Sequence, residues 1–387
     1  MSANGQTRQK AVVCHGAVDL KIEDRAIEQP SDGEVQIQVG VTGLCGSDCH
    51  YYTHGANGIF KIQAPMVLGH ESCGIITAVG ANQPPSSTLK VGDRVAMEVG
   101  IYCKTCRFCK SGRYNLCSNM RFASSAKTFP HLDGTMREYM CWPSEMCYKL
   151  PNTLDLPLAA LAEPLAVVLH AYKRAHLQPG SRILVLGAGA VGLLVCSLAR
   201  ASGATAVVAV DIEQGKLDFA KEMGWATGTY VLPKGPRVSG LDALDTAKTG
   251  WEGLQASQAV TDHLALEEGF DCVFECTGVE SCMQMAVMAA LPGTKVMFVG
   301  MGTANLLLPT GPAFIREVDL HGVFRYANCY PGALALLASG QLGNVGKMVT
   351  QRYTLDQADE AFQAVKNGKD KDGKVVVKVM IGNLDLV

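Results

Sequence analysis

The stretch Ser181–Asp211, SRILVLGAGAVGLLVCSLARASGATAVVAVD, indicates the fold of the middle of this chain. An apolar run over Ser181–Leu186 leads directly into a turn with three glycines, and the residues after the turn predict a helix to about Ser202. A second apolar run, Ala206–Val210, follows and ends in an acidic residue. Short apolar strands separated by helices are typical of parallel sheets, which are buried on both faces. The stretch therefore predicts a βαβ unit.

The glycines of this turn have the spacing of a dinucleotide-binding site. Gly187, Gly189 and Gly192 form G-x-G-x-x-G, and Asp211 follows 19 residues after the last of them. The first glycine permits the tight turn, the second lets the backbone approach a pyrophosphate, and the third lets helix and strand pack closely. Asp211 would accept hydrogen bonds from ribose hydroxyls and repel a 2′-phosphate, which favours NAD over NADP, with Lys216 flanking the ribose. The alternative is a glycine-rich turn without a ligand.

The segments on either side of this unit differ in pattern. Residues 10–150 predict a β-rich region, in which alternating runs lie between glycine and proline turns. Further on, apolar strands alternate with helices until about Thr310, where the pattern becomes mixed. The expected elements include strands at Glu34–Val41, Gly74–Val79, Asp271–Glu275, Lys295–Val299 and Lys374–Ile381 and a helix at Leu161–Ala175. We therefore expect an α/β protein with a β-rich domain and a doubly wound parallel sheet.

The composition limits the classes of protein and partner. The chain has 387 residues, enough for two or three domains, and its net charge of −2 favours neither nucleic acid nor an anionic membrane as a partner. The seventeen uncharged residues between Arg182 and Arg200 are fewer than the roughly twenty that a membrane span needs. Fifteen cysteines without a secretory signal are typical of reduced thiols, so we expect a cytoplasmic protein.

Four of the cysteines crowd into a short segment. Cys103, Cys106, Cys109 and Cys117 have the spacing C-x2-C-x2-C-x7-C. Tetrahedral zinc takes four thiolates, and a closed set of four leaves no position for a substrate, so the motif predicts a structural zinc site. An iron–sulfur cluster is the alternative, because ferredoxins use similar runs of cysteines.

A second set of candidate metal ligands is spread along the chain. Cys45 lies in GLCGSD, His70 and Glu71 lie in GHE, and Glu163 lies in AEP. These are zinc-ligand types, and a site with three protein ligands keeps a position open for water or substrate. Each residue alone also has a simpler interpretation, as a core cysteine, a surface His-Glu pair and an acid at a helix start. The residue types by themselves leave both interpretations open.

In their order along the chain, these and other motifs resemble those of the zinc-dependent medium-chain dehydrogenases, specifically the sorbitol or polyol dehydrogenase branch. The resemblance covers nearly the whole chain and includes GLCGSDCHYY, PMVLGHES, VGDRVAMEVG, the four-cysteine motif, AEPLAVVLHA, LGAGAVG, ECTGVES and IREVDLHGVFRY. It implies a GroES-like catalytic domain over 1–160, with the zinc lobe at 103–117. It also implies a Rossmann NAD-binding domain over 161–310 and a return to the catalytic domain over 311–387.

The resemblance implies two zinc ions per chain, one structural and one catalytic. Cys45, His70 and Glu71 are similar to the ligands of the catalytic zinc. Glu163 is similar to a residue that binds this zinc or its water in the polyol branch. Replacement of a thiolate ligand by a carboxylate makes a harder site, which suits a polyhydroxy substrate.

The resemblance also implies residues that orient a zinc ligand and residues that carry the proton away from the substrate hydroxyl. Asp48 resembles the acid that orients the ligating histidine. Ser47 and His50 occupy the positions of a hydroxyl–imidazole proton relay. The alternative route runs through Glu163 and water, with His50 then only an exposed polar residue.

The resemblance also implies contacts with dinucleotide and substrate. The additional cofactor residues are Val191, Val299, Gly300, Met301, Val323, Phe324 and Arg325, and the substrate residues are Tyr51, Phe122, Glu163, Arg325 and Tyr326. Arg325 offers a rigid fork of donors and Tyr326 a pivoting hydroxyl, which suits a substrate with several hydroxyls. The alternative for Arg325 is a contact with the cofactor or with an interface.

The implied activity is oxidation of a secondary hydroxyl of a sugar alcohol to the ketose, with hydride transfer to NAD, by a homotetramer. Sorbitol, xylitol, L-arabinitol and galactitol are the candidate substrates. The alternatives are a dehydrogenase of another secondary alcohol, such as L-idonate or L-threonine, and a zinc-free relative without catalysis. Two stretches depart from the branch: 121–131, which contains Phe122, and 233–269, expected as a surface excursion without an assigned function.

Overall fold

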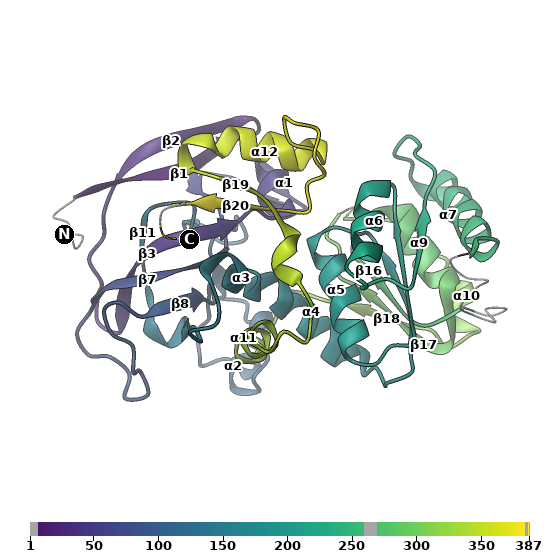
Figure 1. Ribbon diagram of the computed structural model, residues 1–387, viewed down its shortest axis with the longest axis horizontal. Helices are drawn as coiled ribbons and strands as arrows, with labels where there is room; N and C mark the ends of the chain where they lie inside the picture. Colours follow the sequence, from purple (N-terminus) through teal and green to yellow (C-terminus); the bar gives the residue numbers. More distant parts are fainter. Residues whose placement is uncertain (1–6, 259–268, 303, 384–385, 387) are drawn as a thin grey trace. The chain divides into compact units, whose positions relative to one another are not determined.

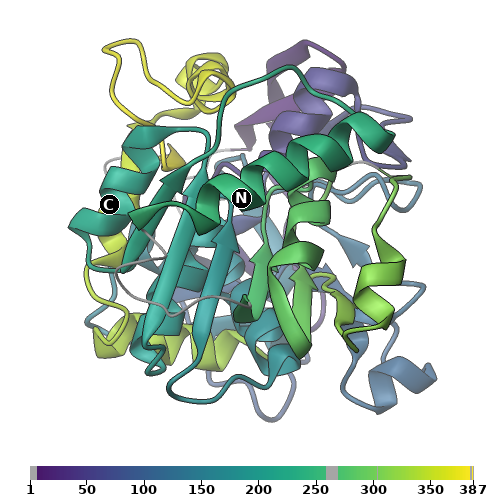
Figure 2. The ribbon, with the colours of Figure 1, turned by 90° about the vertical axis from the view of Figure 1, so that its right-hand side faces the viewer.

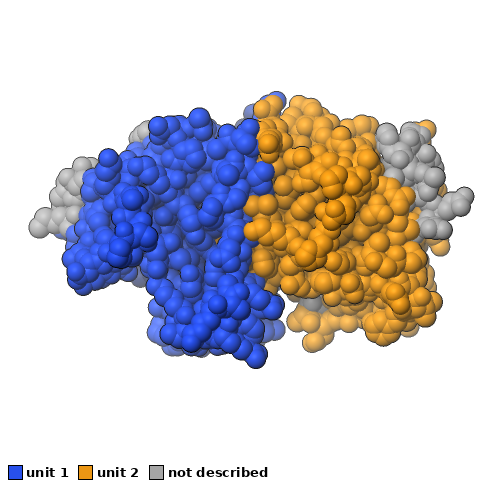
Figure 3. All heavy atoms as spheres, turned by 90° about the horizontal axis from the view of Figure 1, so that it is seen from below, with its two compact units in different colours: residues 1–166, 327–339, 346–387 blue, residues 167–326, 340–345 orange. Residues whose placement is uncertain are grey.

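The computed structural model describes residues 7–258, 269–302, 304–383 and 386, and divides into two compact units, which Figure 3 colours separately. Unit 1 comprises residues 1–166, 327–339 and 346–387. Unit 2 comprises residues 167–326 and 340–345. The expected stretch 233–269 is described except for residues 259–268, which lie outside the described residues.

Unit 2 is built on a six-stranded parallel sheet in the order β15-β14-β13-β16-β17-β18, with helices on both faces (Figure 1, Figure 2). This is the expected doubly wound sheet. The strand order reverses between β13 and β16, and at such a point the carboxyl ends of the strands form a ligand-binding crevice. The strands are β13 (Arg182–Leu186), β14 (Ala206–Asp211), β15 (Gly228–Val231), β16 (Phe270–Glu275), β17 (Ala290–Phe298) and β18 (Asp319–Gly322). The helices are α5 (Ala190–Ala201), α6 (Gln214–Glu222), α7 (Gly240–Gln255), α9 (Glu280–Ala289) and α10 (Thr310–Phe314).

The strands of this sheet are apolar because both faces are covered. Leu184, Val208, Val273 and Val296 have no exposed surface and form one core cluster. Burial of such a side chain favours folding by about 1.5–3 kcal/mol. The uncharged run after Arg182 is thus a core strand, a turn and a buried helix. In the described parts of the chain, no helix combines the length and apolar character needed to cross a membrane.

Unit 1 is rich in strands, and its main sheet combines both ends of the chain. The order is β12-β8-β7-β3-β20-β19, with β11 also paired to β3, and a second sheet has the order β2-β1-β6. β20 runs antiparallel to β3, with Ile381 opposite Thr42. The C-terminal segment therefore completes a sheet that begins near the N-terminus.

The elements of unit 1 position the candidate ligands. The strands of its two larger sheets are β1 (Arg8–Gly16), β2 (Asp19–Ala26), β3 (Glu34–Gly43), β6 (Met66–Val67), β7 (Glu71–Val79), β8 (Arg94–Met97), β11 (Tyr139–Pro143), β12 (Cys147–Lys149), β19 (Val349–Tyr353) and β20 (Lys378–Gly382). Short pairs are formed by β4 (Ala56–Asn57) with β5 (Phe60–Lys61) and by β9 (Gly100–Ile101) with β10 (Arg121–Phe122). The helices are α1 (Gly46–His54), α2 (Arg107–Lys110), α3 (Leu156–Ala160), α11 (Tyr330–Ser339) and α12 (Ala358–Asn367), and α4 (Ala162–Ala175) leads from unit 1 into unit 2.

The boundaries between the units differ from those expected at 160/161 and 310/311. The chain enters unit 2 after Ala166, inside α4, and returns to unit 1 at Ala327. The return is later than expected because β18 still pairs with β17 in the parallel sheet. Residues 340–345 also belong to unit 2, where the carbonyl of Leu342 accepts hydrogen bonds from Ser197 and Trp225.

The last strand also begins later than expected, at Lys378 instead of Lys374. Lys374 closes a turn in which its amide donates to the Asp370 carboxylate and its carbonyl accepts from the Asp370 amide. These backbone groups are therefore used in the turn and not in the sheet.

Candidate active site and metal centres

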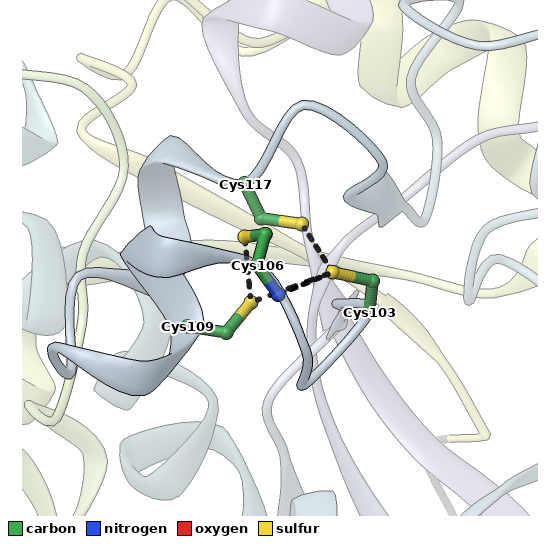
Figure 4. Close-up of side chains that lie close together, drawn as sticks. All are labelled: Cys103, Cys106, Cys109 and Cys117. Atoms are coloured by element: carbon green, nitrogen blue, oxygen red, sulfur yellow. Dashed lines mark hydrogen bonds between the residues drawn. The ribbon is translucent and has the colours of Figure 1, made fainter.

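The thiols of the four clustered cysteines converge on a common centre (Figure 4). The Sγ atoms of Cys103 and Cys109 are 3.9 Å apart, those of Cys106 and Cys109 3.5 Å, and those of Cys117 and Cys103 3.5 Å. Four sulfurs at about 2.3 Å from a tetrahedral zinc lie about 3.8 Å from one another, so the spacing fits one such ion. An iron–sulfur cluster holds several iron atoms and needs its thiolates farther apart. The geometry favours zinc.

The local structure stabilises the thiolate of one of these cysteines, Cys103. The amide of Cys106 lies 3.4 Å from the Cys103 sulfur, and the hydroxyl of Thr105 lies 3.6 Å from it. These donors, the Cys106 amide first, lower the pKa of the Cys103 thiol to about 6. The thiolate is the form that binds metal, so these donors favour the ligand state of Cys103.

The dispersed candidate ligands come together at a second centre. The Cys45 sulfur, a His70 ring nitrogen and a Glu71 carboxylate oxygen all lie within 4.8 Å of one another. Gly69, just before the histidine, has a φ of 94°, and a Cβ there would lie 2.6 Å from Thr42. Only glycine therefore fits the turn that directs His70. Three ligands leave one position of a tetrahedral site open, as catalytic zinc sites do.

Asp48 orients the histidine of this centre. It is completely buried, and one of its oxygens lies 3.4 Å from His70 Nδ1. The carboxylate accepts hydrogen bonds from the Ser124 hydroxyl at 2.7 Å and from the amides of Cys45 and Gly69 at 3.1 Å each. Burial alone would raise the pKa of Asp48, but His70 and these donors outweigh it and lower the pKa. An ionised Asp48 keeps the imidazole proton on Nδ1 and presents Nε2 to a metal.

A buried lysine that the sequence analysis did not select completes the centre. Lys378 forms an ion pair with Glu71, and its Nζ donates to the carbonyl of Leu44 at 3.2 Å. Burial lowers the pKa of Lys378, but the charges of Glu71, Cys45 and Glu163 outweigh it and raise the pKa. Lys378 is therefore a cation among the anionic ligands. The available signal was a lysine inside the apolar run VVVKVM, since lysine is rarely buried without a partner.

The residues predicted to move the proton lie around this centre. The Ser47 hydroxyl is 3.4 Å from His70 Nε2. Glu163 is 5% exposed and acts on the pKa of Lys378, but it does not belong to the set of ligand atoms within 4.8 Å. His50 is half-buried on α1, where its ring stacks on His54 at 5.7 Å. Their roles in the reaction stay predictions.

Two predicted substrate residues also belong to unit 1. The ring of Phe122 lies 5.8 Å from the ring of His70, beside the centre. Tyr51 is buried in the core, and its hydroxyl accepts a hydrogen bond from the Ala126 amide at 2.9 Å. Tyr51 thus holds the stretch 121–131, whose sequence departs from the polyol branch. The same stretch contains Ser124, which donates to Asp48 beside the centre.

The glycine-rich turn of unit 2 has the geometry that its sequence predicts. Gly187 has a φ of 97°, which disfavours other residues. A Cβ on Gly192 would lie 1.8 Å from the Gly187 carbonyl oxygen, so helix and turn pack without room for a side chain. A Cβ on Gly189 would meet nothing within 4 Å. Open space above this position is what a pyrophosphate requires.

Asp211 lies at the end of β14, next to the turn. Its carboxylate accepts hydrogen bonds from the amide of Ala188 at 2.6 Å and from that of Glu213 at 2.9 Å. With Gly187, Gly189 and Lys216 it lines a cavity of about 1040 Å³. Small-molecule pockets have volumes of about 300–1,000 Å³, so a large part of a dinucleotide fits here.

Comparisons with known proteins identify the family of this chain. Residues 31–152 match the alcohol dehydrogenase GroES-like domain, and residues 190–339 match the zinc-binding dehydrogenase family. The D-xylulose reductase A of Aspergillus oryzae is 39% identical over 389 residues, which cover 100% of each chain. The chain belongs to the zinc-dependent medium-chain dehydrogenases. Sorbitol dehydrogenase of Gallus gallus is 38% identical over 381 residues and 98% of each chain. The structure of L-idonate 5-dehydrogenase from Escherichia coli has a TM-score of 0.81 and 29% identity, covering 97% of this chain and 99% of that one.

Membership in the medium-chain dehydrogenases confirms the expected fold and cofactors. The GroES-like and Rossmann regions are those of the family, and zinc and NAD are its cofactors. The converging thiols, the three-ligand centre with its buried Asp48 and the glycine-rich turn fit these groups.

The other predicted cofactor and substrate residues of this dehydrogenase lie in unit 2. Val191 is in the first turn of α5, and the remaining residues follow β17 or β18 at the carboxyl edge of the sheet, where parallel strands place their binding loops: Val299, Gly300, Met301, Val323, Phe324, Arg325 and Tyr326. The described lining of the Asp211 cavity does not include them. The Arg325 guanidinium lies over the Phe324 ring at 4.8 Å, and Tyr326 is 3% exposed. Their contacts with ligands stay predictions.

Proposed function

We propose that this dehydrogenase oxidises a secondary hydroxyl of a sugar alcohol to the ketose, with NAD as hydride acceptor. The observation that carries the proposal is the three-ligand centre of Cys45, His70 and Glu71, which keeps one position open. The same chain has a closed set of four thiols, so the open centre is the one available to a substrate. Similarity to xylulose reductase and sorbitol dehydrogenase over nearly the whole chain supports a polyol as the substrate. The candidate polyols are sorbitol, xylitol, L-arabinitol and galactitol.

When bound, zinc polarises the substrate hydroxyl and NAD accepts the hydride. Cys45, His70 and Glu71 hold the metal, and Asp48 keeps His70 in the tautomer that presents Nε2. Lys378 balances the negative charge of the ligand set, because its ammonium group pairs with Glu71 inside the protein.

Loss of the hydroxyl proton requires a positioned acceptor. Ser47 is close enough to the centre to receive it, and His50 on the same helix would pass it on. Glu163, almost fully buried near Lys378, is the alternative acceptor, acting through water. A pH profile of turnover that changes in Glu163→Gln but not in His50→Gln would assign the role to Glu163.

The cofactor is held by unit 2. The amides of the turn at Gly187–Gly192 and the start of α5 bind the pyrophosphate, since helix N-termini carry unpaired N–H donors. Asp211 accepts from the ribose hydroxyls and Lys216 flanks them, both at the same cavity.

We assign the preference for polyols over simple secondary alcohols to four residues: Tyr51, Phe122, Arg325 and Tyr326. A site built to pair hydroxyls leaves its polar groups unmatched when the substrate lacks them. We expect Arg325→Ala to lower kcat/KM strongly with a polyol and only slightly with a simple secondary alcohol. Equal losses with both substrates would place Arg325 at the cofactor or in the fold instead.

A second candidate is oxidation of another secondary alcohol by the same machinery. The structural similarity to L-idonate 5-dehydrogenase favours L-idonate in particular, and L-threonine is tested beside it. The 39% and 38% identities to the polyol enzymes, against 29% to L-idonate 5-dehydrogenase, make polyols the first choice. A zinc-free, non-catalytic relative would contain no zinc, whereas we expect about two zinc ions per chain.

We propose that the protein assembles as a homotetramer. Phe314 and Ile315, at the end of α10, are 71% and 86% exposed, and β18 is an edge strand of its sheet. Exposed apolar side chains beside an open sheet edge favour contact with a second copy. Light scattering should give a mass of about four chains, and a monomer would contradict the proposal. We also place the protein in the cytoplasm, which its fifteen free cysteines support.

The experiment that tests the function uses the open centre. Cys45→Ser and His70→Ala should abolish polyol oxidation while NADH binding, measured by fluorescence, stays within about twofold, because the turn that binds NADH belongs to the other unit. Equal loss of turnover and NADH affinity would contradict the separation of the two sites.

A further inference from the structure

The segment after β15 forms one wall of the cavity that contains Asp211. Leu232–Val238 line this cavity, as do residues of the first turns of α7, including Asp242 and Thr246. This is the longer stretch for which the sequence predicted only a surface excursion. Its position beside the turn and Asp211 gives it access to whatever the cavity binds.

This wall is fixed at several points. The Leu232 amide donates to the Asp211 carbonyl at 3.0 Å, and Lys234 pairs with Glu213 at 2.6 Å. At its other end the Gly240 amide donates to the buried carboxylate of Glu280 at 3.0 Å. Two of the intervening residues are prolines, whose φ angles are fixed. The segment therefore presents its side chains in a defined place.

The helix that follows is seated closely against β15. A Cβ on Gly253 would lie 2.2 Å from the Tyr230 hydroxyl oxygen, and a Cβ on Gly250 would lie 3.0 Å from Leu232. These glycines let α7 approach the strand that precedes the wall. The wall is thus a packed element of unit 2.

Arg237 is the unpaired cation that this wall contributes to the cavity. It is exposed, and within the described residues it forms no ion pair, whereas Lys234 is held by Glu213. Ile212, next to Asp211, is 48% exposed and gives the same cavity an apolar surface. An uncharged aromatic group suits this combination, because a planar guanidinium stacks on aromatic faces.

We propose that Arg237 stacks on the adenine ring of NAD, and that Leu232–Val238 is the recognition segment for the adenosine half of the cofactor. The proposal rests on the proposed function in one respect, which is that NAD binds at the turn. Asp211 places the ribose, so the base lies in the same cavity, where Ile212 and Arg237 line its walls.

The test measures binding, with the full zinc-loaded protein and three variants: Arg237→Gln, Arg237→Lys, and Lys221→Gln as a control that removes an exposed cation from α6. NADH and NADPH are each titrated by fluorescence, and AMP and nicotinamide mononucleotide compete with NADH. Arg237→Gln should weaken NADH and AMP by the same factor, about 3- to 30-fold, the range for a cation over an aromatic face. Nicotinamide mononucleotide and the control should be unaffected. Arg237→Lys should lose most of the affinity that Arg237 adds for NADH and AMP, because lysine keeps the charge but lacks the planar guanidinium group.

Three results would overturn the inference. Unchanged AMP affinity in Arg237→Gln would remove Arg237 from the adenosine half. Full affinity in Arg237→Lys would show that only the charge matters. A loss confined to NADPH would assign Arg237 to a 2′-phosphate. Failure of the proposed function is distinguishable, because it would appear as absent NADH binding or absent polyol turnover in the unchanged protein.

Discussion

Alanine at Gly189 or at Gly192 separates the cofactor role of the turn from its structural role. A Cβ on Gly189 would meet nothing within 4 Å, and its φ of −75° and ψ of −175° suit any residue. At the N-cap of α5, alanine lowers the free energy of unfolding by about 0.5 kcal/mol relative to glycine. The unfolded chain with alanine has less conformational entropy, which raises the free energy of unfolding by about 0.4–1 kcal/mol. The free energy of unfolding should therefore change by less than about 0.5 kcal/mol.

At Gly192 the same change meets backbone. The Cβ would lie 1.8 Å from the Gly187 carbonyl oxygen and 3.3 Å from Val185. The turn or α5 has to move, and overpacking of this kind costs about 1–3 kcal/mol. At about 2–4 °C per kcal/mol for a unit of this size, a cost near 2 kcal/mol lowers Tm by about 4–8 °C.

The assay combines thermal unfolding without cofactor and NADH titration by fluorescence. Gly189→Ala should keep its Tm yet lose at least about tenfold in NADH affinity, or about 1.4 kcal/mol, because the methyl group fills the space that the pyrophosphate approaches. Gly192→Ala should lose Tm and affinity together. NADH binding by Gly189→Ala like that of the unchanged protein, or unfolding as early as that of Gly192→Ala, would contradict a cofactor role for Gly189.

Three further predictions concern the structural zinc, an ion pair and cofactor choice. Cys106→Ser should reduce zinc from about two ions to about one per chain, measured by atomic absorption, and lower Tm without altering NADH affinity; unchanged Tm with altered substrate selectivity would contradict this. Asp271 is partly buried, which would raise its pKa, but hydrogen bonds from Arg182 outweigh burial and lower the pKa. The stabilisation by Asp271 is thus fully present above the unfolded pKa of about 3.9 and is lost as pH falls through the lower folded value. Asp271→Asn should therefore cost about 1 kcal/mol at pH 7 and progressively less as pH falls below about 3.9. A pH-independent difference in urea unfolding would refute that. Asp211→Ser with Ile212→Arg should raise kcat/KM for NADP at least about tenfold, as a charge-assisted contact with the 2′-phosphate allows; efficient NADP use before the change would remove the role of Asp211.

The parts of the site that sequence could predict are those whose residues are close in the chain. The turn at Gly187–Gly192 and the cluster at Cys103–Cys117 each need only local spacing, and the structure has both as expected. The centre of Cys45, His70 and Glu71 combines segments that sequence spacing alone left ambiguous, and there the family resemblance was decisive.

The missed features depend on contacts between distant segments. Lys378 lies far along the chain from Glu71, and the pairing of β3 with both β20 and β7 brings them together. The chain returns to unit 1 later than expected because β18 pairs with β17. The sequence did not predict this pairing, because β18 has only four residues of mixed polarity. Arg237 lies in a segment without regular pattern, so its place in the Asp211 cavity is visible only in the folded unit.

The most direct test of polyol oxidation is a screen of NAD reduction by the zinc-loaded protein. Sorbitol, xylitol, L-arabinitol, galactitol, L-idonate, L-threonine and 2-propanol are compared at equal concentration by absorbance of NADH. We expect efficient reduction with at least one five- or six-carbon polyol and very poor reduction with 2-propanol. Comparable rates with 2-propanol, or no reduction with any polyol by protein that contains two zinc ions, would contradict it.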